Sequence, residues 1–345
     1  MNARAETIRD AALPPLSAQD AETLIRRIEG IALYTHAYSL HLNFRYGGFT
    51  PCDLLDFAAK HGHHGVKIHL EDGEEASLGR MDASSRARFA QKARQLGLDV
   101  HLEISETEVQ SLRKAILVGH QTGATSIRCY PRYEGRVSDV IARAIEDLRH
   151  LQELDPVGQF LFTVEQHEDL TGAELVRIVE AVGNPNLSLM FDFTNMINAY
   201  EHPLDALRAM AAHITEVHIK DAKVVDDKGG WGQQCCRSGE GDIPQARLLM
   251  ELLLLGKDEP QVRAFGLEEE VGYFSPAFRF PGEEQDPYIP HRALSETKLD
   301  PEANLQELLA REVADAEHLC SHILKLLKQL RDHATDSLGA TSRCI

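Results

Sequence analysis

Four short segments in the second half of the chain each end an apolar run with a side chain that can bind a metal ion. These residues are Glu165 in LFTVEQH, Asp192 in LSLMFDF, His218 in ITEVHIK and Glu268 in AFGLEEE. If the four runs are parallel strands of one sheet, the four side chains lie at the same end of that sheet. Three carboxylates and one imidazole suit Mg²⁺ or Mn²⁺, and a single imidazole also admits Co²⁺, Fe²⁺ or Zn²⁺. The pattern therefore predicts a site for one divalent cation.

Eight short runs of β-branched or aliphatic residues recur along the chain and are predicted to be strands. They are 31–38, 65–70, 98–104, 125–130, 160–165, 187–192, 214–219 and 263–270. Stretches with helical periodicity lie between most of them, at 50–62, 84–97, 137–154 and 172–183. Alternating strands and helices imply parallel pairing, and eight strands are the number that closes such a sheet. We therefore predict an α/β fold, a (β/α)8 TIM barrel. An open doubly wound sheet would need a Gly-rich turn after its first strand, and the GEGD sequence at 239–242 follows the seventh.

A single domain is predicted over residues 21–335, with flexible tails at 1–20 and 336–345. The segment 271–300 is rich in Pro and aromatic residues and is too long for an ordinary connection, which indicates a lid or a partner surface. A stripe of apolar residues at helical spacing after it predicts a closing helix over 302–331, packed on the barrel.

Composition excludes several classes of partner. The formal net charge is -18 and Lys and Arg are not clustered, which argues against a nucleic-acid partner. No apolar run approaches the roughly 20 residues of a membrane span. The first residues lack a secretory signal, so we expect a cytoplasmic protein that binds a small carbohydrate and possesses no membrane segment. The six cysteines form no disulfide framework and no zinc-site spacing. Assembly into a homo-oligomer stays open.

Several motifs resemble those of one enzyme family. The segment VEQHEDLT (164–171) resembles the fifth-strand signature of the sugar phosphate isomerase/epimerase family, the xylose-isomerase-like barrels related to endonuclease IV. FDFTNM, VHIKDAK and GEGDIP are similar to its sixth-strand, seventh-strand and following-loop motifs, in that order. The resemblance covers roughly residues 31–270. It implies that Glu165, Asp192, His218 and Glu268 are ligands of one divalent cation, often Mn²⁺ or Mg²⁺.

The chain departs from the family pattern at two positions. Many epimerases of the family carry His three residues after the sixth-strand Asp, where this chain has Asn195. The run from Glu268 to Glu270 also leaves the eighth-strand ligand ambiguous, because residues two apart on a strand point to the same side. The family's pattern of a hydrophobic residue followed by Glu favours Glu268 over Glu270.

A cation held by acids can polarise the carbonyl of an α-hydroxyketone and stabilise the enediolate that follows. If a C–H bond breaks, Glu165 and Glu268 would act as the acid/base pair of an isomerase or epimerase. If the bond to a carboxylate breaks, the reaction is a decarboxylation. The stretch FGLEEEVGYFSPAFRFP, with FDFTNM, resembles 3-oxo-isoapionate decarboxylases, which implies loss of CO₂ from a β-keto sugar acid as the leading prediction. A non-catalytic sugar-binding barrel, or a subunit of a complex, is the remaining alternative.

Polar residues near the predicted strand ends are expected to bind the substrate. They are His36, His69, Arg128, His167, Asn195, Lys220, Asp221 and Arg237. The Arg and Lys residues could supply the positive charge that an anionic substrate needs in so acidic a chain. For each residue taken alone, a surface ion pair or a buried structural histidine explains the position equally. The cluster HGHHG at 61–65 precedes the second strand and is predicted to be solvated or structural, because catalytic residues of such barrels follow the strands.

Overall fold

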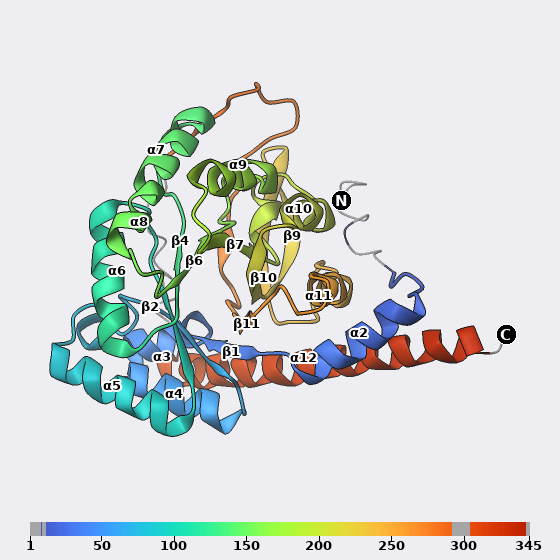
Figure 1. The fold of residues 1–345 in the computed structure, drawn as a ribbon, viewed down its shortest axis with the longest axis horizontal. Helices are drawn as coiled ribbons and strands as arrows, with labels where there is room; N and C mark the ends of the chain where they lie inside the picture. Colours follow the sequence, from blue (N-terminus) through green and yellow to red (C-terminus); the bar gives the residue numbers. More distant parts are fainter. Residues whose placement is uncertain (1–7, 9–11, 292–303, 343–345) are drawn as a thin grey trace.

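Eight parallel strands close into a barrel in the computed structural model, which describes residue 8 and residues 12–291 and 304–342 (Figure 1). The strands are β1 (Leu33–His36), β2 (Gly65–His69), β3 (Asp99–Glu103), β4 (Ser126–Cys129), β6 (Leu161–Glu165), β7 (Leu187–Asp192), β8 (Ile214–Ile219) and β11 (Ala264–Leu267). Their order around the barrel is β1-β11-β8-β7-β6-β4-β3-β2. All eight predicted runs contain one of these strands, so the predicted (β/α)8 barrel is confirmed.

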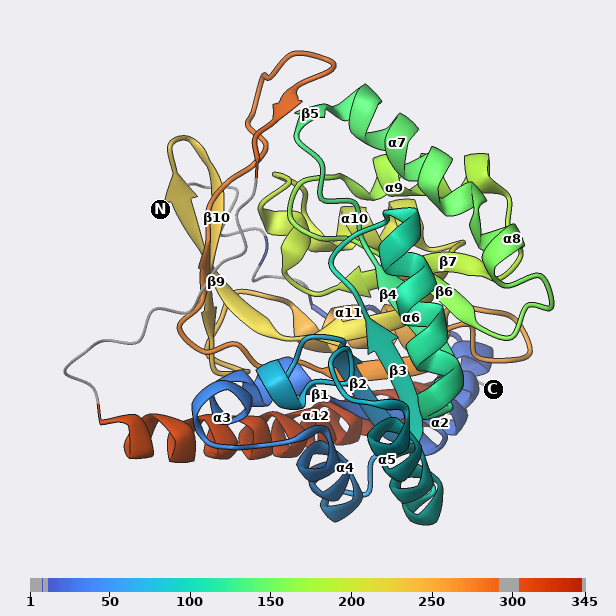
Figure 2. The same cartoon turned by 90° about the vertical axis from the view of Figure 1, so that its left-hand side faces the viewer.

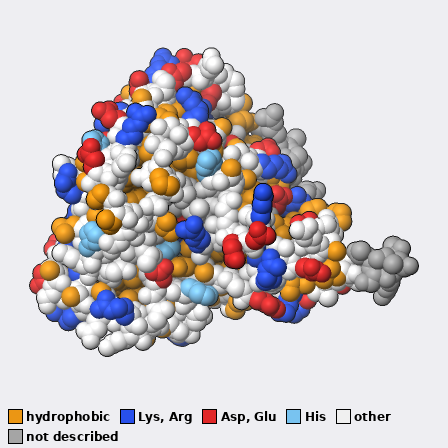
Figure 3. Space-filling model, viewed as in Figure 1, with side chains coloured by type: hydrophobic (Ala, Val, Ile, Leu, Met, Phe, Trp, Pro, Cys, Tyr) orange, Lys and Arg blue, Asp and Glu red, His pale blue; other side chains and the backbone are white. Residues whose placement is uncertain are grey.

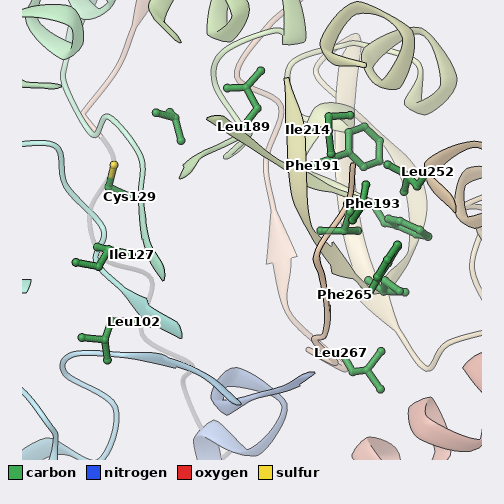
Figure 4. Packing of buried hydrophobic residues seen from close by; sticks show 14 of the residues in the cluster. Leu102, Ile127, Cys129, Leu189, Phe191, Phe193, Ile214, Leu252, Phe265 and Leu267 are labelled. Atoms are coloured by element: carbon green, nitrogen blue, oxygen red, sulfur yellow. The ribbon is translucent and has the colours of Figure 1, made fainter. Parts of the chain in front are cut away.

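Helices cover the outside of the barrel between successive strands. They are α4 (Pro51–Lys60), α5 (Ala83–Leu96), α6 (Val109–Thr122), α7 (Val137–Arg149), α8 (Leu151–Leu154), α9 (Gly172–Val182), α10 (Pro203–Met210) and α11 (Gln245–Leu254). Local sequence sets their ends. In α9, Thr171 and Glu174 form a capping box at the first turn, and Gly183 ends the helix in the left-handed conformation with φ of +66°. Buried apolar side chains fill the space between strands and helices, and Figure 4 draws part of this cluster, including Phe191 on β7, Ile214 on β8 and Leu252 on α11.

A long C-terminal helix closes the fold. Helix α12 (Leu305–Ser342) packs alongside α2 (Ala18–Glu29), and Figure 1 shows the two side by side. The helix was predicted to end at 331, but it continues to Ser342, so the residues from 336 to 342 are helical and not the predicted flexible tail. Their continuation follows from packing: Leu330 and Ala334 are fully buried. Helix α2 begins within the predicted tail 1–20, whose other residues lie largely outside the described part of the chain.

A small accessory sheet stands beside the mouth of the barrel. We use this name for β9 (Asp221–Asp227), β10 (Gly230–Cys236) and β12 (Phe274–Ser275), which pair in the order β12-β10-β9. Figure 2 shows the β9–β10 hairpin extending from the barrel strands. Strand β13 (Tyr288–Ile289) pairs with β5 (Gly135–Arg136). The described part of segment 271–300 thus contributes two strands, and residues 292–300 lie outside the described residues.

The barrel interior holds two layers of polar side chains. Residues two apart on a strand point to the same side, so β3 contributes His101 to the lower layer and Glu103 to the upper one. In the lower layer, Lys67, His101 and Ser126 all contact the carboxylate of Glu216. All four side chains are buried. At Gly266 a Cβ atom would lie 2.6 Å from Lys67 Cδ and 3.0 Å from His218 Cδ2, so the missing side chain makes room for both layers.

Three further short helices connect the barrel strands to the site. They are the 3₁₀ helices η1 (Ala37–Leu40) and η3 (Asn195–Ile197) and the α-helix α3 (His41–Tyr46). The first turn of α3 depends on a carboxylate from α12. Glu312 accepts hydrogen bonds from the backbone N–H of Leu42 at 2.8 Å and of Asn43 at 2.9 Å.

The burial of Glu312 predicts a pH effect on stability. Burial raises the pKa of Glu312 from 4.5 to about 6, although the backbone N–H of Leu42 opposes the shift. The folded state then binds more protons than the unfolded state, so this group's contribution to stability is lost as the pH rises from about 4.5 to about 6. We expect the stability of Glu312→Gln relative to the parent to rise by about 2 kcal/mol between pH 4.5 and pH 7. Urea unfolding at both pH values measures this difference, and equal differences at the two would contradict it.

Candidate metal centre

The four predicted ligands converge at the carboxyl ends of their strands. Glu165 ends β6, Asp192 ends β7, His218 lies in β8 and Glu268 directly follows β11. One ligand atom from each lies within 4.8 Å of the others, and all four side chains are buried. The pairing of Asp192 with His218 across β7 and β8 fixes two of them side by side.

The orientation of His218 is fixed by carboxylates on both sides of its ring. Its Nδ1 lies 3.0 Å from Glu165 Oε1 and 3.2 Å from Glu268 Oε2. Its Nε2 lies 3.0 Å from Glu103 Oε1. A proton on Nε2 donated to Glu103 leaves the Nδ1 lone pair directed at the other acids, which is the arrangement that metal-binding histidines adopt.

Glu103, at the end of β3, was not predicted as a site residue. It also accepts a hydrogen bond from His36 Nε2 at 2.9 Å and contacts the guanidinium of Arg128. Burial would raise the pKa of Glu103, but Arg128, His36 and His218 hold it well below its usual value. It is therefore an ionised carboxylate behind the predicted ligand His218. Its position in the sequence could have indicated a site residue, because Glu103 lies at the carboxyl end of a predicted strand, near where the four predicted ligands lie on theirs.

The donor set suits a divalent cation. Three buried oxygens, Glu165 Oε2, Asp192 Oδ2 and Glu268 Oε2, accept no hydrogen bond of normal geometry, although Arg128 Nε lies 3.1 Å from the first and Lys220 Nζ lies 3.1 Å and 3.4 Å from the other two. Burial would lower the pKa of His218, but Glu268, Glu103 and Glu165 raise it well above its usual value. Burial also raises the pKa of Asp192, against the opposing effect of Lys220. The cluster therefore concentrates negative charge that a cation would neutralise.

Glu268, and not its rival Glu270, belongs to the four-residue cluster. Lys220 Nζ lies 3.1 Å from Asp192 Oδ2 and 3.4 Å from Glu268 Oε2, whereas Glu270 Oε2 is 3.8 Å from Lys220 Nζ. Burial raises the pKa of Glu270 well above its usual value, and Lys220 opposes this. Glu270 thus lines the site behind the predicted ligand.

A cavity of about 960 Å³ opens above the cluster. Six of the predicted substrate-binding residues line it, and they are His36, His69, Arg128, His167, Asn195 and Lys220. His167 stacks on Tyr130 with ring centroids 3.9 Å apart. The segment 273–278, which includes β12, lines the cavity as well. The cavity is therefore polar at the cluster and partly aromatic above it.

Two predicted substrate-binding residues lie elsewhere. Asp221 is turned away from the cavity, where its carboxylate accepts the backbone N–H of Gly239 at 2.8 Å and of Gly241 at 3.0 Å. It holds the GEGD loop in place. Arg237 Nε lies 3.1 Å from Asp315 Oδ1 on α12, so Arg237 ties the same loop to the closing helix. Neither residue is among those that line the cavity, so the structure does not bring these two residues to the other predicted ones.

The histidine cluster before β2 lies outside the cavity, and its members differ in burial. His63 is buried, and its Nδ1 lies 2.7 Å from Thr35 Oγ1. None of His61, His63 and His64 lines the cavity.

On the face drawn in Figure 3, acidic and basic side chains are interspersed. Among the helices that the structure describes, none has the length and apolar character needed to cross a membrane.

Comparison with known proteins gives matches in sequence and in structure. The model of the xylose isomerase-like TIM-barrel family matches residues 55–260. An uncharacterized protein of Escherichia coli K12, YihM, is 46% identical over 324 residues, which cover 94% of this chain and 99% of that protein. The IolI protein, solved with a bound zinc atom, has a TM-score of 0.61 at 12% identity and covers 87% of this chain and 99% of its own. A D-psicose 3-epimerase, solved in the presence of D-fructose, has a TM-score of 0.54 at 14% identity and covers 69% of this chain and 85% of its own. At these identities the two structures show likeness of fold alone.

Proposed function

Because the chain belongs to the xylose isomerase-like TIM-barrel family, we propose that it is a divalent-metal-dependent enzyme acting on a keto sugar or a keto sugar acid. One observation carries the proposal. One ligand atom from each of three buried carboxylates and His218 lies within 4.8 Å of the others, and Glu103 holds His218 Nε2. Glu165, Asp192, His218 and Glu268 are the residues that would hold the cation, with Mn²⁺ or Mg²⁺ as the first candidates.

The size and lining of the cavity support a sugar as the substrate. Its volume of about 960 Å³ is ample for a five- or six-carbon sugar. A D-psicose 3-epimerase of the same fold was solved in the presence of D-fructose, which makes ketoses the first compounds to test. His36, His69 and Asn195 offer polar contacts, while the aromatic pair Tyr130 and His167 offers a flat surface.

The geometry favours breakage of a C–H bond next to the carbonyl. When bound, the cation supplies positive charge that polarises the substrate carbonyl. Glu165 and Glu268 are two carboxylates of the cluster that also line the cavity, so each can take or return a proton at the adjacent carbon. Arg128 Nε, 3.1 Å from Glu165 Oε2, keeps that carboxylate in place. Two acids at one site are the requirement for isomerisation or epimerisation.

Decarboxylation of a β-keto sugar acid, such as 3-oxo-isoapionate, is the second candidate. It is favoured by Lys220 and Arg128, which put two positive charges in the cavity lining. A substrate carboxylate requires such charges in a chain of net charge -18. The two candidates share the carbonyl-binding step and differ in the bond that breaks.

Metal dependence is the deciding experiment. Protein treated with a chelator is expected to lose turnover of its substrate, and added Mn²⁺ or Mg²⁺ is expected to restore it, because the three acids would otherwise repel one another. A panel of ketoses and keto sugar acids in D₂O, followed by NMR and mass spectrometry, separates the chemistries. Deuterium in a product of unchanged carbon skeleton supports epimerisation or isomerisation, and loss of CO₂ supports decarboxylation. Turnover that persists without metal would reject the metal-dependent enzyme.

A further inference from the structure

Three buried polar atoms without partners lie where the accessory sheet meets the cavity. They are Asn195 Nδ2, Gln233 Oε1 and Ser275 Oγ. Each residue is at most 1% exposed. Asn195 and Ser275 line the cavity, and Gln233 donates a hydrogen bond from Nε2 to Asn195 Oδ1 at 3.2 Å. Gln233 and Ser275 are paired across β10 and β12, so their side chains lie on the same face of the accessory sheet. That face is the one that meets Asn195.

This part of the cavity is rigidly connected to the metal centre. Asp192 Oδ1 accepts the backbone N–H of Asn195 at 2.9 Å, which fixes the start of η3. Three residues later, Asn198 Nδ2 donates to the carbonyl oxygens of Ser275 at 3.0 Å and Pro276 at 2.7 Å. The carbonyl oxygen of Asn198 accepts the N–H of Phe278 in return. The segment 192–198 therefore connects the predicted ligand Asp192, the side chain of Asn195 and strand β12.

The unpartnered atoms are complementary to a neutral hydroxyl group. The hydrogen bond between the two amides leaves the NH₂ group of Asn195 and the carbonyl oxygen of Gln233 without partners. If both amides are flipped, Asn195 presents the carbonyl oxygen and Gln233 the NH₂ group. The Ser275 hydroxyl can donate or accept. Asn195 and Ser275 line the cavity, and a sugar hydroxyl, which both donates and accepts, can bond to the Asn195 amide and to the Ser275 hydroxyl.

We infer that Asn195, Gln233 and Ser275 form a subsite that binds hydroxyl groups of the substrate, with its carbonyl end directed to the metal centre. Asn195 and Ser275 contact the hydroxyl groups. Gln233 is a positioning residue, since it holds the Asn195 amide. The inference rests on the proposed function, because it takes the ligand to be a sugar, and it assigns hydroxyl groups of that sugar to Asn195 and Ser275.

Binding of xylitol tests the subsite separately from the chemistry. This neutral pentitol has no carbonyl and cannot be epimerised or decarboxylated, so its binding measured by calorimetry does not depend on turnover. We expect Asn195→Leu to weaken xylitol binding to the full-length, metal-loaded protein about 10-fold, and Ser275→Ala about 5-fold. Gln234→Leu is the matched control, because Gln234 is the neighbour of Gln233 on β10 and points to the opposite face, where its Nε2 donates to the carbonyl oxygen of Tyr273.

The outcomes separate this inference from the proposed function. An unchanged affinity in Asn195→Leu and Ser275→Ala, an equal loss in Gln234→Leu, or no binding of xylitol to the parent protein would overturn the subsite. Metal-dependent turnover of a ketose, measured on the parent protein, reports on the proposed function alone. A crystal structure with xylitol adds a direct check: a hydroxyl oxygen within hydrogen-bonding distance of Asn195 Nδ2 and Ser275 Oγ supports the subsite, and xylitol placed elsewhere in the cavity rejects it.

Discussion

Replacing Glu165 by Gln is expected to lower kcat/KM by more than about 10²-fold for the substrate that the panel identifies. Gln keeps the size of the side chain but can neither take a proton nor supply the charge that a cation requires. Both proposed roles of Glu165 are therefore lost at once. Steady-state kinetics with saturating metal measure the effect, and near-normal activity would remove Glu165 from the site.

Metal content separates the two roles of Glu165. If Glu165→Gln still binds the cation while turnover is lost, proton transfer is the missing step, and if the cation is lost, ligation is. Glu269→Gln is the control, because Glu269 is a buried acid beside Glu268 that bonds to Ser238 and does not line the cavity. We expect the control to retain most of the activity. A loss in the control as large as that in Glu165→Gln would point to general destabilisation.

Replacing Glu103 by Gln is expected to weaken binding of the divalent cation by about 10- to 100-fold. Glu103 accepts from His218 Nε2 at 3.0 Å and from His36 Nε2 at 2.9 Å, and it carries the charge that Arg128 meets. The Gln side chain carries no negative charge, and its NH₂ group, itself a donor, would face the N–H donors of His218 and His36. The orientation of His218 would then be less well defined. Competition with a fluorescent chelator measures the affinity without any substrate.

Glu106→Gln is the matched control for Glu103. Glu106 follows the same strand by three residues and also lines the cavity, but it is exposed and bonds to Ser111 instead of to a predicted ligand. Its replacement is expected to leave the cation affinity within about twofold, the scale of a weakly coupled surface charge. Equal affinities in Glu103→Gln and the parent would show that His218 is oriented by its other contacts.

The barrel was predictable because its strands are short apolar runs separated by amphipathic helices. The accessory sheet was not. Its hairpin, DAKVVDDKGGWGQQCC, mixes charged and apolar residues, and only pairing with the distant residues Phe274 and Ser275 completes the sheet. The end of α12 was set by burial against α2, which local sequence does not show.

The site was predictable where a residue type and a strand end coincided, as at Asp192 and His218. Asp221 was predicted to bind substrate because it directly follows Lys220. Successive residues of extended chain point to opposite sides, so the Asp221 side chain is turned away from the cavity that Lys220 lines. Arg237 was predicted to bind substrate because it is a cationic residue in a long loop. The sequence does not show that its ion-pair partner is Asp315 on α12. Glu103 was missed because its role depends on three partners from other strands, and the sequence does not show which of them meet.

The lack of a side chain at Gly266 is required both by the buried ion pair of Lys67 with Glu216 and by the predicted ligand His218. A methyl group at this position would collide with the side chain of Lys67 on one side and with the ring of His218 on the other. A homologue with alanine at this position would therefore need a shorter residue in place of Lys67 or a shifted ring at His218. Lys67, Gly266 and His218 are thus expected to be inherited together or replaced together, although Lys67 is no part of the predicted cation site.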